Sequence, residues 1–368
     1  MRRIHASDLR PFVAELVSGL DASEDVAETV AESLVEADLR GHGSHGSIRM
    51  GTSYLEMIET GEIHPRATPE LEPLSGVTAQ VDGNGQYGQV VGRRAVEAGI
   101  ELTEDRDVAM VGVRDASHLG RIGEWAERAA EAGRCFAAFV NTGGTDPLVT
   151  PPGSADRLFS TNPLAFGVPS FGALPHPIVL DMATSQVAHG KVTKRAVENR
   201  PLPEGWVVDE AGEIVTDSDE YEEAGRGALM PLGGLTSGHK GFGLAMIAEL
   251  FAGIVGDHPV TGQGGGEWVN NGAMFVFADP DGFSNEAANR ERVEALAGMI
   301  RDAEGPDAVP MGPSAKGDRA RIPGEPEHET REKRLAEGIP FHEETLELLA
   351  DVAREVDAEA AIPDSFGV

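Results

Sequence analysis

The hydrophobic pattern at the two ends of the chain constrains the fold more than any other feature of the sequence. Residues 327–337 and 343–356 have the periodicity of amphipathic helices, and so do residues 23–39 near the N-terminus. We expect the two ends to pack together as one helical domain of residues 1–73 and 327–368. The clearest helical spacing of all is that of Leu9, Phe12, Val13, Leu16, Val17 and Leu20.

The middle of the chain, residues 74–326, has a different pattern. Short apolar runs that predict strands alternate with longer helical segments, as is typical of an α/β (α+β) core. A hairpin is predicted over 206–215. The predicted strands are 77–81, 108–113, 135–140, 178–180 and 274–277, and the predicted helices are 89–102, 120–132 and 241–255.

The charge balance argues against a nucleic acid partner. The chain has 30 basic and 62 acidic residues, a net charge of −32, and only five lysines. Binding to phosphate backbones needs a basic surface, which this composition does not supply. Scattered acidic residues with few lysines suit a concentrated salt solution, where screening suppresses their mutual repulsion. We therefore predict a protein from a halophilic cytoplasm.

Hydropathy and cysteine content also favour the cytoplasm. No apolar run approaches the ~20 residues that a membrane span needs. The N-terminal segment MRRIHASDLRPF has no apolar stretch that could act as a signal peptide. Cys135 is the only cysteine, which rules out an intramolecular disulfide and a cysteine zinc site. We expect no membrane partner.

A loop rich in histidine and glycine, ADLRGHGSHGSIR at 37–49, is the first candidate site. An imidazole such as that of His45 exchanges a proton near neutral pH. The guanidinium of Arg49 can bind a carboxylate through two hydrogen bonds. Ser47 is a candidate N-cap for a helix that follows, and Ser44 adds a hydroxyl. The combination suits a small acid that carries a carbonyl or hydroxyl group.

Two other interpretations of this loop stay open. It could be a solvated loop whose imidazoles only bind backbone atoms. His42 and His45 could also ligate a metal, although apart from each other only Asp38 lies at helical spacing from them. We therefore predict no metal site.

A glycine pattern at 83–88, GNGQYG, matches the dinucleotide fingerprint G-x-G-x-x-G. It follows a predicted strand and precedes a predicted helix. However, D-G-N-G is also an ordinary turn, and the preceding strand alternates with polar residues. The first strand of a doubly wound sheet is usually continuously apolar. A classical Rossmann fold is therefore the weaker alternative.

Further candidate side chains lie where strands end or helices begin. His118 follows a predicted strand, and Thr161 and Asn162 lie in a polar segment after another. Residues 181–185, DMATS, place more small polar groups at a strand end. His239 and Lys240 precede an apolar helix whose N-terminus would favour an anion such as a phosphate.

Six segments, in order along the chain, resemble the type-2 malate/L-lactate dehydrogenase family of NAD(P)-dependent 2-oxoacid and imine reductases. That group includes sulfolactate, ureidoglycolate and diketogulonate enzymes. The segments are DLRGHGSHGSIRM, VRDASHLG, STNPLAF, VLDMATS, PLGG…HKGFGLAM and IPGE. The resemblance implies a non-Rossmann cofactor domain with a largely antiparallel sheet, residues 74–326, beside the helical domain. It also implies NAD or NADP as cofactor, and a homodimer.

The resemblance assigns roles to individual residues. His45 and His118 fall on positions that exchange a proton in different members, and Arg49 falls on a substrate-carboxylate position; with Ser44 they form the expected catalytic group. Gly43 stands where many members have Asp. The expected cofactor-binding residues are Ile178, Val179, Leu180, Asp181, Met182, Ala183, Thr184, Ser185, His239, Lys240, Gly324, Glu325, Pro326, Thr161 and Asn162.

The expected function is hydride transfer between NAD(P)H and C2 of a small 2-oxo or 2-hydroxy acid, with a histidine exchanging the proton. Malate, lactate and sulfolactate are equally compatible with the sequence, and so are NAD and NADP. The alternatives are a classical Rossmann dehydrogenase, a metal-dependent lyase that uses His42 and His45, and a non-catalytic binding protein of the same fold.

Overall fold

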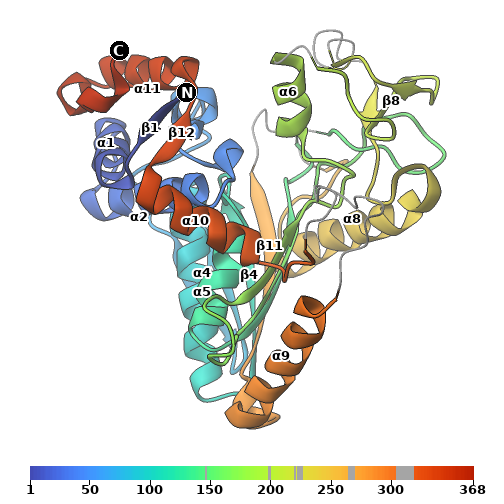
Figure 1. Ribbon diagram of the computed structural model, residues 1–368. Helices are drawn as coiled ribbons and strands as arrows, with labels where there is room; N and C mark the ends of the chain where they lie inside the picture. Colours follow the sequence, from blue (N-terminus) through green and yellow to red (C-terminus); the bar gives the residue numbers. More distant parts are fainter. Residues whose placement is uncertain (146, 198–199, 219–220, 222–226, 264–269, 304–318) are drawn as a thin grey trace.

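The structure is a computed structural model that describes residues 1–145, 147–197, 200–218, 221, 227–263, 270–303 and 319–368. A central sheet with its covering helices forms the base of the molecule, and two lobes rise from it (Figure 1). One of these, the helical lobe, contains both chain termini. The other, the small lobe, contains α6 (His189–Val197) and a short sheet.

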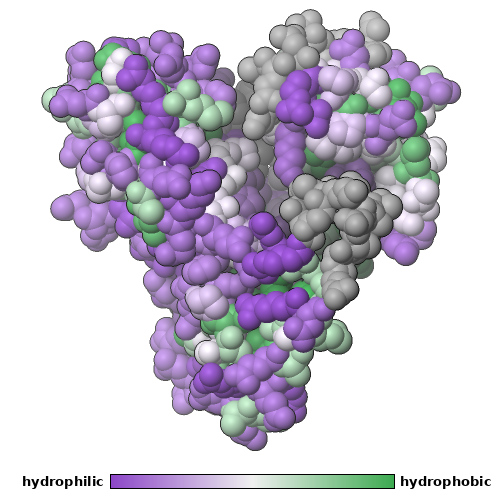
Figure 2. Space-filling model, in the orientation of Figure 1, coloured by the Kyte–Doolittle hydropathy of each residue, from purple (hydrophilic) through white to green (hydrophobic). Residues whose placement is uncertain are grey.

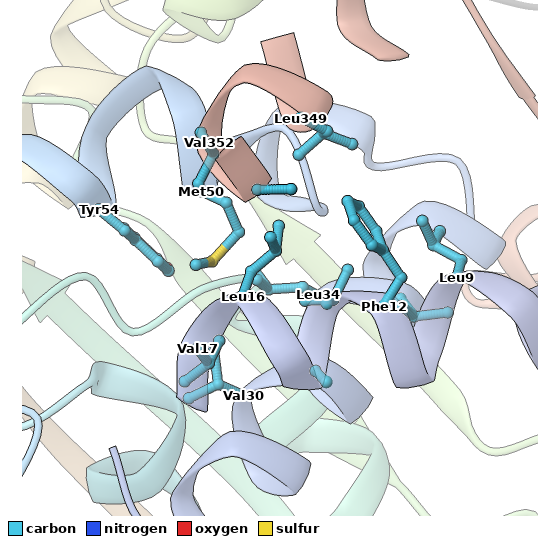
Figure 3. Packing of buried hydrophobic residues seen from close by; sticks show 14 of the residues in the cluster. Leu9, Phe12, Leu16, Val17, Val30, Leu34, Met50, Tyr54, Leu349 and Val352 are labelled. Carbon is cyan, nitrogen blue, oxygen red and sulfur yellow. The ribbon is translucent and has the colours of Figure 1, made fainter. Parts of the chain in front are cut away.

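The helical lobe contains segments from both ends of the chain. It consists of α1 (Ala6–Gly19), α2 (Glu24–Leu39), α10 (Glu325–Glu337) and α11 (Glu343–Glu355). Strand β1 (Arg2–Ile4) pairs antiparallel with β12 (Ile339–Phe341). The apolar spacing of α1 explains the core, since its buried face meets α2 and α11 (Figure 3). Phe12 and Phe366, from opposite ends of the chain, pack edge to face with ring centroids 5.0 Å apart.

The central sheet is largely antiparallel and is not a doubly wound Rossmann sheet. Among the neighbouring strands that the structure describes, only β3 and β4 run parallel. In spatial order the strands are β2 (Glu70–Ser75), β3 (Thr78–Asp82), β4 (Val108–Ala116), β11 (Asn271–Ala278), β5 (Cys135–Asn141), β6 (Leu164–Val168) and β7 (Ile178–Met182).

Helices cover both faces of this sheet. α4 (Gly88–Glu104) and α5 (Gly123–Glu131) pack on one face, around buried Trp125 and Phe277. α8 (Gly234–Gly256) packs on the other face. A Cβ at Gly112 of β4 would lie only 2.2 Å from the carbonyl oxygen of Val255, so this glycine permits the close approach of α8.

The small lobe contains the predicted hairpin, which is confirmed. β8 (Val207–Val208) pairs with β9 (Ile214–Val215) and with β10 (Ala228–Leu229). The structure also contains β1, β2, α6 and α9 (Glu286–Arg301), which the sequence pattern did not predict. α9 buries little besides Val293 and Ala297, so its apolar periodicity is weak.

Candidate active site

A buried carboxylate at the end of α2 anchors the His-rich loop. Asp38 is 2% exposed, and its Oδ2 accepts hydrogen bonds from the backbone N–H and the hydroxyl of Ser47, at 2.9 and 2.7 Å. Burial raises the pKa of Asp38 to about 7. A Cβ at Gly46 would lie 1.9 Å from Oδ1 of Asp38, so only glycine fits there. The carboxylate therefore fixes the backbone next to His45.

Ser47 is not the helix N-cap that the sequence predicts, because its hydroxyl is used by Asp38. The chain instead passes through a 3₁₀ turn, Gly43–His45, and a π-helical turn, Met50–Tyr54, before the short helix α3 (Leu55–Glu59). Tyr54, at the end of the π-helical turn, is buried.

His118 lies in the loop between β4 and α5, and two contacts fix that loop. The backbone N–H of Leu119 donates to Oδ1 of Asn271 at 2.8 Å. Gly88 packs so closely that a Cβ there would lie 2.2 Å from the carbonyl oxygen of His118. The loop thus presents His118 toward the helical lobe.

The structure brings His45 and His118 together, 73 residues apart in sequence. Nδ1 of His45 and Nε2 of His118 are 3.2 Å apart. Nδ1 of His118 is in turn 2.9 Å from the hydroxyl of Tyr54, to which Nε2 of Gln89 on α4 donates at 2.6 Å. Four side chains from four segments thus form one continuous hydrogen-bonded chain.

Burial and a neighbouring cation keep both imidazoles neutral. Burial lowers the pKa of His45 to about 3, with a further contribution from the positive charge of Arg49. The same two causes hold the pKa of His118 well below its usual value. Burial raises the pKa of the Tyr54 phenol to about 12. The four hydrogen-bonded side chains are therefore uncharged at neutral pH.

Arg49 lies beside this pair, and its Nε donates to the carbonyl oxygen of Ser44 at 2.7 Å. Across from Ser44 is Gly190 at the start of α6, where a Cβ would lie 3.3 Å from the Ser44 Cβ. The helical and small lobes therefore meet at the His-rich loop, and Figure 2 shows the surface hollowed between them. All four predicted catalytic residues gather there.

The expected cofactor-binding residues fall along the edge strand β7. At one end, the backbone N–H of Val179 donates to the carbonyl oxygen of Pro323, directly before Gly324. At the other end, the hydroxyl of Thr184 donates to the backbone oxygens of Thr161 and Asn162, at 3.0 Å each. The outward side chain between them, Leu180, is 42% exposed.

Asp181 and Glu325 do not face that open surface. Oδ2 of Asp181 accepts from the backbone N–H of Gly123 at 2.8 Å, beside the buried Arg121, and burial raises its pKa. Glu325 is 7% exposed and accepts from Arg319. Both residues have the positions expected for support of the strand and helix ends rather than for direct contact with a ligand.

His239 and Lys240 are exposed on α8, but the helix begins earlier than predicted, at Gly234. A left-handed Gly233, with φ of 95°, starts the helix, and an irregular Ser237 joins its first turn to the rest. Lys240 therefore lies just after this irregularity instead of at the first turn.

The glycine pattern at 83–88 is unsuited to binding a pyrophosphate, because the protein itself uses every backbone N–H of the loop. A Cβ at Gly85 would lie 2.7 Å from Nδ1 of His64. The loop packs against its neighbours instead of facing a ligand. The acceptors, in order from residue 83 to 88, are Arg114 O, Asp82 Oδ1, Asp115 O, Gly83 O, Gln86 Oε1 and Ser117 Oγ.

The chain was compared with known proteins. The family model described as malate/L-lactate dehydrogenase matches residues 4–350. A malate dehydrogenase of Pyrococcus abyssi is 33% identical over 371 residues, 96% of this chain and 95% of the relative. The chain belongs to the malate/L-lactate dehydrogenase family.

Two more members of the malate/L-lactate dehydrogenase family show how far the similarity extends. A malate/(S)-sulfolactate dehydrogenase of Methanothermus fervidus is 29% identical, covering 97% of this chain and 98% of the relative. The solved sulfolactate dehydrogenase of Methanocaldococcus jannaschii superposes with a TM-score of 0.83 at 27% identity, covering 97% and 98% of the two chains. The chain is accordingly an oxidoreductase that acts on a hydroxy acid.

Three residues of the candidate site are not evident from the sequence pattern: Asp38, Tyr54 and Gln89. Each of these side chains is polar and buried. The spacing of residues along a single helix or strand does not reveal buried polar side chains. Tyr54 follows Arg49 closely in sequence, and that was the only signal. Within the described residues, no helix is long and apolar enough to cross a membrane, and no group of three or more potential metal-ligating side chains occurs.

Proposed function

We propose that the protein transfers a hydride between NAD(P)H and C2 of a small 2-oxo or 2-hydroxy acid of the malate, lactate or sulfolactate type. The observation that carries this proposal is the neutral His45–His118 pair beside Arg49. A proton-exchanging group next to a fixed cation suits a substrate that carries a carboxylate one bond from its reacting carbon.

We assign the proton exchange to His45. Both ring nitrogens of His118 are engaged, one with Tyr54 and one with His45. Nδ1 of His45 is engaged with His118, and among the described residues Nε2 of His45 has no hydrogen-bond partner. That nitrogen is the one left to meet a substrate oxygen. His118 then orients His45.

We assign the substrate carboxylate to Arg49. A guanidinium binds a carboxylate through two parallel hydrogen bonds and so fixes both its position and its orientation. Arg49 is close enough to His45 and His118 for its charge to lower the pKa of both. A bound carboxylate would offset that charge and make proton uptake by His45 easier.

The residues present fit a nicotinamide dinucleotide along β7. The strand has an open outer side at Leu180, and exposed His239 and Lys240 could bind phosphates. Oδ1 of Asn162 is a buried acceptor without a partner in the described part of the chain. The cofactor, when bound, would supply the hydride; Ile178–Leu180, Met182–Ser185, Thr161, Gly324 and Pro326 would hold it, while Asp181 and Glu325 would support these segments from behind.

We also propose that the protein is a homodimer that docks through α8. The outer side of this helix exposes large apolar side chains, including Ile254 at 74% and Leu235 at 64%. Phe251 on the same helix is 37% exposed and packs edge to face against Phe139 of the sheet. Several exposed large apolar side chains on one helix are typical of an interface. Ile254→Asp should give a monomer by light scattering in molar KCl.

Turnover of a substrate panel tests the function directly. Pyruvate, oxaloacetate and sulfopyruvate are each offered with NADH and with NADPH in molar KCl, and loss of cofactor absorbance is followed. Oxidation of either cofactor by one oxoacid supports the proposal. Cofactor binding, seen as fluorescence transfer from tryptophan, without any turnover would favour the binding-protein alternative. Activity abolished by a chelator would favour the metal-dependent alternative.

A further inference from the structure

The hydrogen-bonded chain behind His45 ends at a buried amide. Gln89 is fully buried in the first turn of α4, and its Nε2 donates to the hydroxyl of Tyr54. Its Oε1 is buried and has no partner among the described residues. A buried acceptor without a partner is destabilising, because it has given up its hydrogen bonds to water. The site therefore directs the amide N–H at Tyr54 at the expense of stability.

This amide orders the protons of the whole chain. Because Tyr54 accepts from Gln89, its own O–H is left to donate to Nδ1 of His118. His118 then carries its proton on Nε2 and donates it to Nδ1 of His45. His45 must carry its proton on Nε2, the nitrogen that has no partner. Each imidazole has one proton, consistent with the neutral state that burial favours.

We propose that Gln89 and Tyr54 are positioning residues that hold His45 in the tautomer with its Nε2–H toward the substrate. The inference rests on the proposed function in so far as it names the carbonyl oxygen of a 2-oxo acid as the group that receives this proton. The inference adds the cause of the tautomer. That cause is Tyr54 and Gln89, which are the second and third side chains from His45 along the hydrogen-bonded chain.

Reduction of the substrate moves one proton along this hydrogen-bonded chain. The Nε2–H bond of His45 breaks as the O–H bond of the product forms, while C2 receives the hydride and its electron pair. Nδ1 of His45 takes the proton from Nε2 of His118, and Nδ1 of His118 takes the proton of Tyr54. One negative charge is left on the Tyr54 oxygen, and solvent restores the missing proton through Nε2 of His45 after release of the product.

Two neighbours of Tyr54 offset part of the cost of that charge. The hydrogen bond from Gln89 and the positive charge of Arg49 both favour the ionised phenol, opposing the effect of burial. The helices beside α4 contribute Ser33 and Glu124, which are hydrogen-bonded to each other. Glu124 is also paired with Arg128, so its charge is compensated. Gln89 is therefore useful both before and after the proton moves.

Gln89→Glu provides a test that a merely structural role would not pass. When ionised, the new carboxylate can only accept, so Tyr54 donates to it and every proton of the chain reverses. His45 then carries its proton on Nδ1. When protonated at low pH, the carboxyl can donate and restores the original order. Burial raises the pKa of such a carboxyl, which places the change within a measurable range.

The measurement is ¹⁵N NMR of the histidine rings in the cofactor-free protein, together with the pH profile of kcat for reduction. In the wild type we expect His45 protonated on Nε2. In Gln89→Glu we expect the proton on Nδ1 at high pH, the wild-type tautomer at low pH, and a kcat that falls at least tenfold as the carboxyl ionises. Gln89→Met should lose both the fixed His45 tautomer and the activity at every pH.

Gln80→Glu is the matched control. Gln80 is 5% exposed, and its Nε2 donates to the carbonyl oxygen of Gly256. The substitution buries the same carboxyl without touching the histidines, so the His45 tautomer should stay unchanged. A wild-type His45 protonated on Nδ1, or a tautomer unaltered by Gln89→Glu, overturns the inference even if the enzyme is active. An enzyme inactive on all oxoacids with the expected tautomers overturns the proposed function instead.

Discussion

His45 and His118 stack with their rings 10° from parallel and their centroids 5.2 Å apart, so that each orients the other. From this arrangement we predict unequal effects of removing the two rings. His45→Ala should lower kcat by about 10²–10⁴-fold, the usual contribution of a positioned acid–base group. His118→Ala should lower kcat by less, because it removes only the orienting partner. Both effects are measured under saturating substrate and cofactor.

The opposite order would contradict this assignment. If His118→Ala is the more damaged variant, His118 exchanges the proton and His45 is the orienting group. If both variants turn over at rates near wild type, the proton comes from another group and the proposed chemistry is wrong.

Arg49→Lys should raise the KM of the oxoacid with a smaller effect on kcat and almost none on cofactor binding. Lysine keeps the charge but loses the planar pair of donors that fits a carboxylate. Steady-state kinetics with varied oxoacid checks this. Arg290→Lys is the control, since Arg290 is an exposed arginine of α9 that pairs with Glu294. An unchanged oxoacid KM in Arg49→Lys would show that Arg49 does not bind the substrate carboxylate.

Lys240→Ala should raise the cofactor KM about tenfold, the scale of one charged hydrogen bond of ~1.5–3 kcal/mol. Lys333→Ala is the matched control, because Lys333 is an exposed lysine on α10 and the change in net charge is the same. Gly85→Ala should lower the melting temperature, since Gly85 has a φ of 74° and no room for a Cβ, yet leave the cofactor KM unchanged. If Gly85→Ala raised the cofactor KM more than Lys240→Ala does, the fingerprint loop would be the cofactor site instead.

Asp38→Asn should gain stability relative to the wild type as the pH rises. The folded pKa of about 7 lies above the ordinary 3.8, so the folded protein binds a proton that the unfolded chain has released. The stabilising contribution of Asp38 is complete below pH 4 and is lost by about pH 7. Each pKa unit corresponds to about 1.4 kcal/mol. Asparagine cannot ionise, and its oxygen can still accept from Ser47.

Urea unfolding of both proteins at pH 5 and pH 8 measures this difference. Asp25→Asn, an exposed residue in the first turn of α2, is the control and should shift little between the two pH values. A free-energy difference between Asp38→Asn and wild type that is the same at both pH values would show that Asp38 is ionised throughout.

The fold should require high salt. The net charge of −32 sits on a surface that is hydrophilic over most of the face in Figure 2. In dilute buffer the Debye length exceeds ~10 Å and the acidic groups repel one another, whereas at molar salt it falls to ~3 Å. The melting temperature should therefore rise steeply between 0.05 M and 2 M KCl. A melting temperature that is independent of KCl would contradict the halophilic prediction.

The sequence predicted those parts of the protein whose structure is determined by the residues of a single helix or strand. The apolar spacing of α1 and α11 correctly predicted two helices with buried faces, which need a partner to be stable. The π-helical turn that ends at Tyr54 could not be predicted, since no residue of Met50–Tyr54 is specific to it.

The sequence pointed to the imidazoles and the guanidinium of the candidate site but not to its buried phenol and amide. His45, Arg49 and His118 stand out because their side chains can exchange a proton or bind a carboxylate, whereas Gln89 has the pattern of an ordinary polar residue at a helix start. Its role comes from Tyr54, 35 residues earlier. The weaker Rossmann alternative depended on the fingerprint loop 83–88, whose N–H groups are occupied by partners from distant segments such as Arg114 and Ser117.

The pairing of β1 with β12 has a consequence for synthesis of the protein on the ribosome. The first strand and helices are made early, but Arg334, which donates to the backbone oxygen of Asp38, lies 296 residues later in the chain. Until that segment leaves the exit tunnel, α1 and α2 expose an apolar face to solvent. That face is a natural binding site for chaperones until the residues up to β12 have been made.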